Sequence, residues 1–428
     1  MTTRLHTLAC LSAFCLLLAG CSKQPDNAPV VSDGMARVYI DVNVGGFAGF
    51  DQCPQTKADF VAVDENYRFA TEQIIDNMVV YLFDASDAYM TDAGGKLAFV
   101  PSAAMLLEDA VVLASDQIAT VGNVRRIELH APSTVTSLAV LVLANLDTPA
   151  NYTTGTKGTS SMMAVVNTLT ASKLMAYDAG SAYGTSVGIP MCGWKLFGSL
   201  VGETNLDAAK EEKGLKFYKG MSTPLTETGF SSSSALNAYV SKGFVADKDM
   251  LPLQRRLSRI HLYFTSATGH KEMAIQSAQL TGYRSKICLI PNGIFGTGLT
   301  PFDAVSDAGN VVMNNPLNFR EVSTGHRVVY VPEFNVAAVA GDADKEPYLT
   351  LEAKENGTDL TYTYTKDKVT VSGTGTGLPR EYHYDMPWLH FKTLVTKKDK
   401  DNNDVPAGTY FNLIGNYTYE WTARGVEE

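Results

Sequence analysis

The chain has 428 residues, of which 45% are hydrophobic and 19% charged, and its formal net charge is −10. A nucleic-acid-binding protein usually carries a basic patch, and none is evident here, so the composition argues against a nucleic-acid partner. The length exceeds that of a typical single domain and predicts two domains. After the first 20 residues no apolar run approaches the ~18 residues of a membrane-spanning helix.

The first 21 residues have the pattern of a bacterial lipoprotein signal. Arg4 supplies the positive charge, Leu8–Leu18 forms a short apolar run, and two small residues precede Cys21. A run of this length is too short to cross the ~30 Å hydrocarbon core of a bilayer, so it indicates a cleaved export signal. We therefore expect Cys21 to be acylated and to become the new N-terminus, tethered by the polar segment Ser22–Ser32. The alternative is an ordinary secretory signal with a chance cysteine.

Short strands are predicted through the first half of the chain. Arg37–Val44 alternates apolar and polar residues, as a half-buried strand does, and a long irregular stretch, Gly45–Asn66, follows it. Ile74–Asp84 and Val135–Leu146 are apolar on both faces, which is typical of strands in a sandwich core. Met162–Met175 has apolar residues at helical spacing and is the clearest predicted helix.

A domain boundary is expected near Phe244–Leu251, after which Pro252–Phe264 opens a second β-rich region. Many short strands at ~8–15-residue spacing predict a mainly β fold, with a β-sandwich in each half and short helices in loop excursions. The predicted segments are a signal peptide (1–20), a lipidated pro-segment (21–68), an N-terminal β-sandwich domain (69–250) and a C-terminal β-sandwich domain (251–428).

The cysteines do not predict a disulfide framework or a metal site. Two of the six leave with the signal and a third is the lipid site, so that Cys53, Cys192 and Cys288 remain. Three cysteines allow at most one disulfide within the chain, and no Cys-x-x-Cys or Cys/His metal spacing occurs. Cys192 and Cys288 have apolar neighbours in the sequence and are expected to be buried small hydrophobes.

No catalytic motif emerges, and we expect neither an enzyme nor a bound cofactor. The histidines show no zinc spacing, and no nucleophile elbow or phosphate-binding glycine loop occurs. His383, Asp385 and His390 surround Trp388 and are interpreted as surface or partly packed residues. Asp399–Asp404 resembles the start of a calcium loop but lacks its glycine and glutamate, so a solvated hairpin tip is the favoured interpretation.

Several separated motifs together resemble the fimbrillin family, the pilin subunits of type V pili in Gram-negative bacteria. They follow the lipobox in the family's order and extend to about residue 335. The residues that carry the resemblance are Met78–Asp84 (MVVYLFD), Val140–Leu146 (VLVLANL), Ile189-Pro190-Met191, Pro252–Leu262 (PLQRRLSRIHL) and Tyr330-Val331-Pro332-Glu333. No counterpart of the usual family ending is evident in Tyr382–Glu428.

The resemblance implies transthyretin-like or Greek-key sandwiches and assembly by strand exchange. Family precursors reach the outer membrane as lipoproteins, and an arginine-specific protease then cuts the loop after the first strand. Loss of that strand opens a groove, which a strand from a neighbouring pilus subunit fills. One groove and one donor strand in each subunit make an open head-to-tail polymer. The implied partners are therefore other pilus subunits, the protease, and the outer membrane through Cys21.

Carried over to this sequence, the resemblance makes Arg37–Val44 the removable strand. Its residues are Arg37, Val38, Tyr39, Ile40, Val42 and Val44, together with the polar residues between them. Arg68 is the first arginine after this strand and is the leading cleavage site, with Lys57 as the alternative. If cleavage occurs only at Lys57, or not at all, the chain keeps its lipid and serves as an anchor subunit.

The C-terminal run Tyr410–Thr422 is the expected donor strand. Its large side chains belong to Tyr410, Phe411, Leu413, Tyr417, Tyr419 and Trp421. The alternative is an ordinary edge strand of the second sandwich. Two other function classes remain open at this point: a surface glycan-binding lipoprotein, which would need an exposed aromatic platform, and a surface hydrolase, which would need one of the missing motifs.

Overall fold

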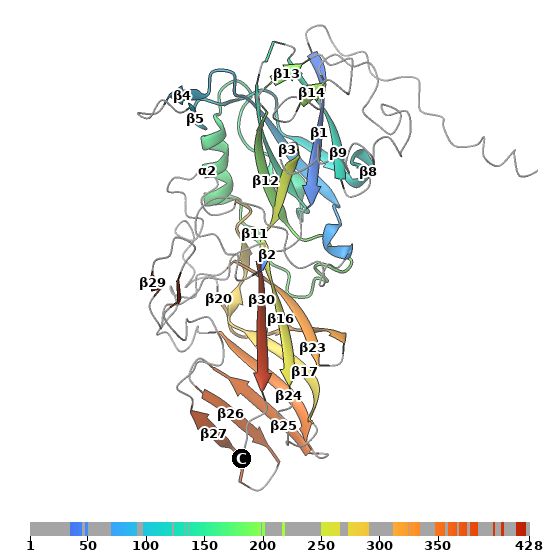
Figure 1. The fold of residues 1–428 in the computed structure, drawn as a ribbon, viewed down its shortest axis with the longest axis vertical. Helices are drawn as coiled ribbons and strands as arrows, with labels where there is room; N and C mark the ends of the chain where they lie inside the picture. The colour runs from blue at the N-terminus through green and yellow to red at the C-terminus, as the bar shows by residue number, and fades with distance from the viewer. Residues whose placement is uncertain are drawn as a thin grey trace, which may run out of the picture.

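In the computed structural model, the mainly β fold predicted from the sequence is confirmed. The structure describes residues 35–44, 48–49, 70–91, 97–121, 124–132, 134–135, 137–197, 199–201, 216–218, 250–265, 273–290, 311–323, 325–333, 347–355, 358–365, 368–374, 377–383, 397–398, 404–405 and 417–424. Within these ranges the chain forms an elongated body with a large sheet at one end and two further sheets at the other (Figure 1).

A nine-stranded sheet makes up the first half of the body. Eight strands follow one another in hydrogen-bonded order, and β7 (Val111–Ala114) pairs with β3 beside that path. In order they are β6 (Met105–Leu106), β3 (Asn77–Asp84), β10 (Leu138–Ala144), β12 (Met191–Phe197), β15 (Leu251–Arg255), β1 (Met35–Val44), β9 (Val124–Pro132) and β8 (Ala119–Val121).

Two sheets make up the other half, and their strands lie below β1 in Figure 1. The first has five strands: β2 (Ala48–Gly49), β30 (Tyr417–Arg424), β16 (Leu257–Thr265), β23 (His326–Pro332) and β22 (Arg320–Ser323). The second has six: β21 (Leu317–Asn318), β17 (Met273–Thr281), β24 (Tyr348–Glu355), β25 (Thr358–Tyr364), β26 (Lys368–Gly373) and β27 (Arg380–His383).

Short paired strands and helices complete the described elements. The two-stranded pairs are β4 (Tyr89–Thr91) with β5 (Leu97–Phe99), β11 (Met175–Ala176) with β19 (Lys286–Ile287), β13 (Ser199–Val201) with β14 (Lys216–Tyr218), β18 (Tyr283–Arg284) with β20 (Val311–Val312), and β28 (Lys397–Lys398) with β29 (Asp404–Val405). The helices are α2 (Met162–Ser172) and the 3-10 turns η3 (Ala70–Gln73), η4 (Ser115–Gln117) and η5 (Pro149–Tyr152). None of them is long and apolar enough to span a membrane.

Apolar patterning accounts for the central elements. All seven residues of β10 and the six inner residues of β3 are buried, as expected for strands covered on both faces. The predicted helix is confirmed, with Ser161 accepting a hydrogen bond from the Ala164 amide at its start. It ends before the predicted Met175 because Lys173 leaves the helical conformation and Met175 enters β11.

The two halves share part of one hydrophobic core. The larger buried cluster contains the inner residues of the nine-stranded sheet together with Leu257, Ile287 and Val328 from the second half. The smaller cluster lies wholly in the second half, where Ile260 and Leu262 of β16 meet strands of the six-stranded sheet. Leu251–Arg255, assigned to the C-terminal region on sequence, pairs with β12 and β1 in the nine-stranded sheet. The division into two independent sandwich domains therefore stays a prediction.

Asn145 connects three segments just beyond β10. Its backbone has a φ of 59°, a left-handed conformation that asparagine tolerates better than most residues. The side-chain amide donates to the carbonyl oxygens of Ile74 and Ile189, each at 2.8 Å, and its oxygen accepts from the Asp76 amide at 2.8 Å. A Cβ atom on Gly188 would lie 2.4 Å from Asn145 Cγ, so the glycine permits this close approach.

Replacing Asn145 with alanine is expected to destabilise the protein by about 3 kcal/mol, because three hydrogen bonds are lost and the left-handed backbone remains. Urea unfolding measures the effect. The matched control is Asn151→Ala, an exposed position, which should change stability by no more than about 0.5 kcal/mol. Equal effects of the two substitutions would contradict the role assigned to Asn145.

Candidate functional site

Strand β1 lies inside the nine-stranded sheet with a partner on each side (Figure 1). It pairs in parallel with β15, where Val42 is opposite Leu251 and Val44 is opposite Leu253. On its other edge it pairs in antiparallel fashion with β9, from Met35 opposite Pro132 to Asn43 opposite Val124. Removing β1 would therefore leave the backbone groups of two facing strand edges without their partners.

Between Ile40 and Val44, the inner face of β1 is apolar and buried. Ile40 and Val42 have no exposed surface and Val44 is 4% exposed, and Ile40 lies opposite Ile127, which is also fully buried. Each such side chain contributes about 1.5–3 kcal/mol when buried. Loss of β1 would thus expose core surface as well as backbone, and this position would have to be refilled.

On the outer face of β1, Asp41 forms a bidentate ion pair with Arg126 of β9. Both carboxylate oxygens of Asp41 accept from Arg126, with Oδ1 2.6 Å from Nε and Oδ2 2.6 Å from Nη2. The two residues are directly opposite each other in the register, and the Arg126 side chain is only 7% exposed. A bidentate pair with so little exposure is stronger and more specific in geometry than a surface salt bridge.

Downstream of β1, the chain is fixed at η3 by Glu72. Arg259 Nη1 lies 2.9 Å from Glu72 Oε1 and 3.1 Å from Oε2, and the Tyr330 hydroxyl donates to Oε1 at 2.6 Å. Arg255 Nη2 donates to the Glu72 backbone oxygen at 2.9 Å. Burial, and then the neighbouring Glu72 carboxylate, raise the pKa of Tyr330 well above its ordinary value. Four buried residues from different parts of the chain thus meet at one point.

A second buried pair lies beside this one. Arg256 is ion-paired with Glu333 and donates to the backbone oxygen of Cys288 at 3.0 Å. Its backbone amide donates to the Pro190 oxygen at 2.7 Å. We call these residues together the arginine cluster: Glu72, Arg255, Arg256, Arg259, Tyr330 and Glu333. The cluster joins η3, β15, β16 and the end of β23 at the junction between the two halves.

Strand β30 lies at one edge of β16, the strand that follows β15 in the chain. It pairs with β16 in parallel, from Thr418 opposite Arg259 to Arg424 opposite Thr265. Only Arg256 separates β15 from β16, so β1 and β30 are successive neighbours of one nearly continuous strand. The two-residue strand β2 lies on the other side of β30, with Ala48 opposite Tyr417. In this structure β30 is therefore a strand of its own subunit's sheet.

The predicted site residues fall into two groups. Cys21, Lys57, Arg68, Tyr410, Phe411 and Leu413 lie outside the described residues. Arg37, Val38, Tyr39, Ile40, Val42 and Val44 all lie in β1, and Tyr417, Tyr419 and Trp421 lie in β30. The two strands belong to different sheets of the subunit, and the removal of β1 and the donation of β30 stay predictions.

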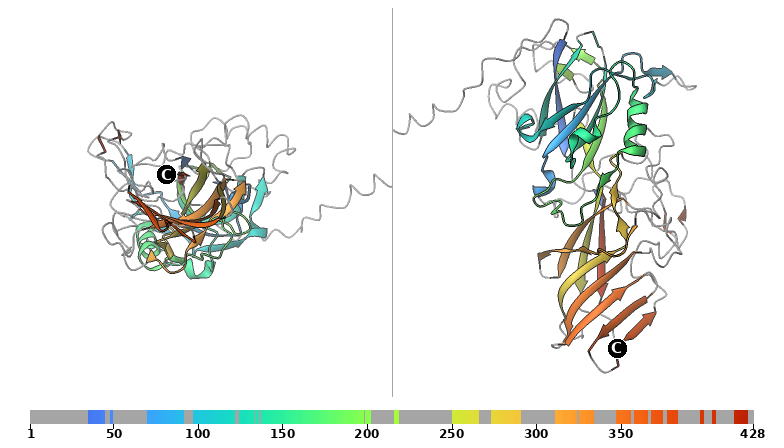
Figure 2. Two further views of the ribbon diagram at one scale, coloured as in Figure 1. Left: turned by 90° about the horizontal axis from the view of Figure 1, so that it is seen from below. Right: turned by 180° about the vertical axis from the view of Figure 1, so that it is seen from behind.

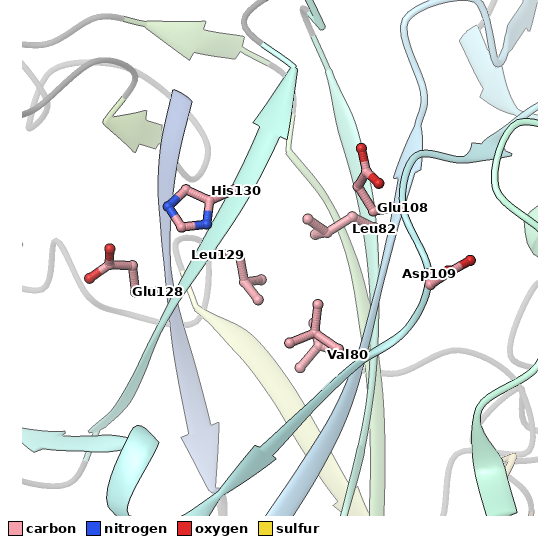
Figure 3. A pocket seen from close by; sticks show the side chains of 8 residues that line it. Val80, Leu82, Glu108, Asp109, Glu128, Leu129 and His130 are labelled. Carbon is pink, nitrogen blue, oxygen red and sulfur yellow. The ribbon is translucent and has the colours of Figure 1, made fainter. Parts of the chain in front are cut away.

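A shallow pocket of about 290 Å³ opens where β9 faces β3 and the chain before β7 (Figure 3). Val80, Leu82 and Leu129 form its apolar lining, while Glu108, Asp109 and Glu128 make its rim acidic. Glu108 is paired with Lys157 at 2.6 Å. His130 also lines this pocket. No cluster of metal-ligating side chains occurs among the described residues.

The two described cysteines are free and buried, in agreement with their expected role as small hydrophobes. Burial raises the pKa of Cys192 to about 12 and that of Cys288 to about 11. Both thiols therefore stay protonated at neutral pH and are poor nucleophiles.

The sequence interpretation missed the arginine cluster, although a signal for it was present. Three arginines (Arg255, Arg256 and Arg259) stand among apolar residues in the predicted strand Pro252–Leu262, and buried arginines need carboxylate partners. Glu333 belongs to the Tyr-Val-Pro-Glu motif, and no sequence pattern marks Glu72 as a partner for these arginines. The Tyr-Val-Pro-Glu and basic-apolar motifs contact each other through Arg256 and Glu333.

Glu72→Gln is expected to destabilise the protein by about 3–5 kcal/mol, because it breaks the buried ion pair between Glu72 and Arg259. Thermal and urea unfolding measure this loss. Glu381→Gln is the control, since Glu381 pairs with Lys368 at the surface and should contribute less than about 1 kcal/mol. A loss at Glu72 no larger than that at Glu381 would contradict the anchoring role.

A buried histidine pair next to β30 predicts a pH dependence of stability. His261 Nδ1 lies 2.6 Å from His326 Nε2, and burial, with Arg259 and His326 nearby, lowers the pKa of His261 to about 3. The unfolded chain takes up this proton near pH 6.5 and the folded chain does not, so stability is fully present above pH ~6.5 and falls as the pH decreases toward 3.

The expected loss between pH 7 and pH 5 is about 2 kcal/mol from His261 alone. Urea midpoints at the two pH values measure it. In His261→Gln the difference between the two midpoints should shrink. An unchanged difference would show that other groups cause the pH dependence.

No protein-family model matches the chain, and no curated protein matches its sequence. Among solved structures, the chain is similar to the tip fimbrial protein Mfa3 of Porphyromonas gingivalis with a C-terminal truncation, with a TM-score of 0.45, 12% identity, and coverage of 92% of this chain and 96% of that one.

It is also similar to a putative cell adhesion protein of Parabacteroides distasonis (TM-score 0.38, 13% identity, 90% and 87% coverage). A fimbrilin (FimA) of P. gingivalis has a TM-score of 0.33 and 11% identity, with 74% and 71% coverage. At these levels of identity and superposition, the similarity says nothing about partners or activity.

Proposed function

We propose that this chain is a structural subunit of a cell-surface fimbria. It is exported as a lipoprotein acylated at Cys21, reaches the outer membrane, and is cut by an arginine-specific protease after Arg68. The cut separates the lipidated segment and β1 from the rest of the subunit. A strand of another subunit then fills the vacated position, and repetition of this step makes an open fibre.

The position of β1 is the observation that carries this proposal. A strand with a neighbour on each edge and an apolar face in the core cannot be lost without replacement. At the same time, its connection to η3 runs through residues 45–69, which contain both Lys57 and Arg68. One cleavage there makes β1 a separate peptide, held only by non-covalent contacts.

The arginine cluster supports the choice of Arg68. Glu72 is buried and bound by three residues only four positions after Arg68. A cut at Arg68 therefore leaves the new N-terminus close to the buried Glu72. The remaining subunit then keeps the contacts of Glu72 with Arg255, Arg259 and Tyr330. Cleavage after Glu72 would instead leave this carboxylate on the released segment, no longer joined covalently to the rest of the subunit.

The processing step is tested on the purified precursor with limited trypsin treatment and N-terminal sequencing of the product. We expect a start at Phe69, its loss in Arg68→Gln, and no change in Lys57→Gln. Loss of processing in Lys57→Gln alone would assign the cut to Lys57.

The N-terminus of the chain in fibres isolated from cells distinguishes the possible roles of the subunit. A product starting at Phe69 in isolated fibres fits a polymerising subunit. A chain that is still lipidated at Cys21 in the fibres fits an anchor subunit and contradicts release by cleavage. Absence of the chain from surface fibres would contradict the proposed function as a whole.

A further inference from the structure

The gap between the two ends of the nine-stranded sheet holds a pocket that the proposed function does not use. At one end of the sheet β6 and β7 pair with β3, and at the other end β8 pairs with β9. The pocket of about 290 Å³ lies between these ends (Figure 3). We infer that it binds an extended polypeptide segment of another protein, in which apolar side chains alternate with basic ones.

The floor of the pocket is apolar and belongs to the core. Val80 and Leu82 of β3 are 0% and 4% exposed, and Leu129 of β9 is 3% exposed. In Figure 3 these three side chains lie between β9 and Asp109. None of the eight described residues that line the pocket has an aromatic ring on which a sugar could stack. The floor therefore suits aliphatic side chains.

The rim adds negative charge on both sides of this floor. Asp109 and Glu128 are exposed, and Figure 3 shows them on opposite sides of the apolar side chains. Glu108 also lies on the rim and pairs with Lys157 at 2.6 Å, and His130 completes the titratable groups of the lining. Such a rim repels phosphate and sulfate groups. Lysine and arginine suit it, because their stems cover apolar surface while their cations bind carboxylates.

Two strand edges beside the pocket favour a polypeptide over a free amine. Within the described residues, β8 pairs with β9 only over Val124–Arg126, so no described strand continues along that edge toward Leu129. β7 pairs with β3 on one edge, and its other edge has no partner among the described strands. Such edges accept an added strand through main-chain hydrogen bonds. An extended segment between them presents alternate side chains to the floor and to the rim.

The pocket does not depend on the fate of β1. In the sheet order β1 pairs with the edge of β9 opposite to that of β8, and Figure 3 shows Val80 and Leu82 on the side of β9 away from β1. The edge beside the pocket is therefore the same whether or not β1 is replaced. The inferred binding is independent of the proposed fimbrial assembly.

Fluorescence anisotropy with the full, uncleaved precursor tests the inference. The probe is a fluorescein-labelled peptide with capped ends in which valine and arginine alternate, and the comparison peptide has glutamate in place of each arginine. We expect the arginine peptide to bind at least roughly tenfold more tightly than the glutamate peptide, and less tightly as salt is added. Equal binding of the two peptides would contradict the role of the acidic rim.

Two pairs of matched variants locate the site. Val111→Trp fills the pocket and should weaken binding at least about tenfold. Its control is Val112→Trp, since Val112 is 42% exposed and lies outside the lining. Asp109→Lys reverses a charge on the rim and should weaken binding about fivefold, whereas Asp116→Lys makes the same change at an exposed position outside the lining.

Both controls should bind within about twofold of the wild type. Urea midpoints show which variants fold, and if Val111→Trp does not, the pair at Asp109 and Asp116 still locates the site. An Asp109→Lys protein that binds as tightly as Asp116→Lys would place the peptide elsewhere and overturn the inference.

Two further probes separate a polypeptide from other ligands. Methylation of all backbone amides of the arginine peptide removes its main-chain donors and should weaken binding at least about tenfold. Spermidine, a polyamine without a peptide backbone, should not displace the labelled peptide. Displacement by spermidine, or unchanged binding of the methylated peptide, would contradict strand addition. If the arginine peptide does not bind the precursor at all, the inference fails, while the fimbrial proposal is still decided by the N-terminus of the chain in fibres.

Discussion

The structure depends on the pairing of β1 with two strands at once. β1 stands between β15 and β9 in the sheet order, and each of these strands pairs with one edge of β1 through backbone groups. An unpaired buried amide or carbonyl is costly, and here a row of them would be exposed together with core side chains. A sheet built in this way needs a strand at that position, whichever polypeptide supplies it. The proposed strand replacement would meet this requirement after β1 is released.

The arginine cluster explains how the rest of the subunit could keep its form during such a replacement. Its residues connect η3 to both halves through buried ion pairs and hydrogen bonds that do not involve β1. Buried ion pairs contribute little net stability compared with apolar packing, but breaking one is strongly unfavourable. The cluster therefore resists partial opening of the junction. This gives the first residues after the proposed cut a fixed place in the subunit.

Local patterning predicted much of the fold. Alternation in Arg37–Val44 and continuous apolar runs in Ile74–Asp84 and Val135–Leu146 correspond to β1, β3 and β10, and helical spacing predicted α2. The pairing of β1 with β15 and of β30 with β16 was not predictable, because parallel partners are distant in sequence and leave no local signal. The transition at Arg256 was missed for a related reason: Pro252–Phe264 looks like one strand, yet its two parts belong to different sheets. Glu72 was missed because a single glutamate in a short segment has no periodic pattern.

The identity of the strand between β15 and β9 in the assembled fibre tests the central claim most directly. An electron cryo-microscopy map of fibres at side-chain resolution identifies that strand by its sequence. The account predicts a strand of a neighbouring subunit at this position, in place of the subunit's own β1. A map in which the subunit's own Met35–Val44 still occupies the position would contradict it.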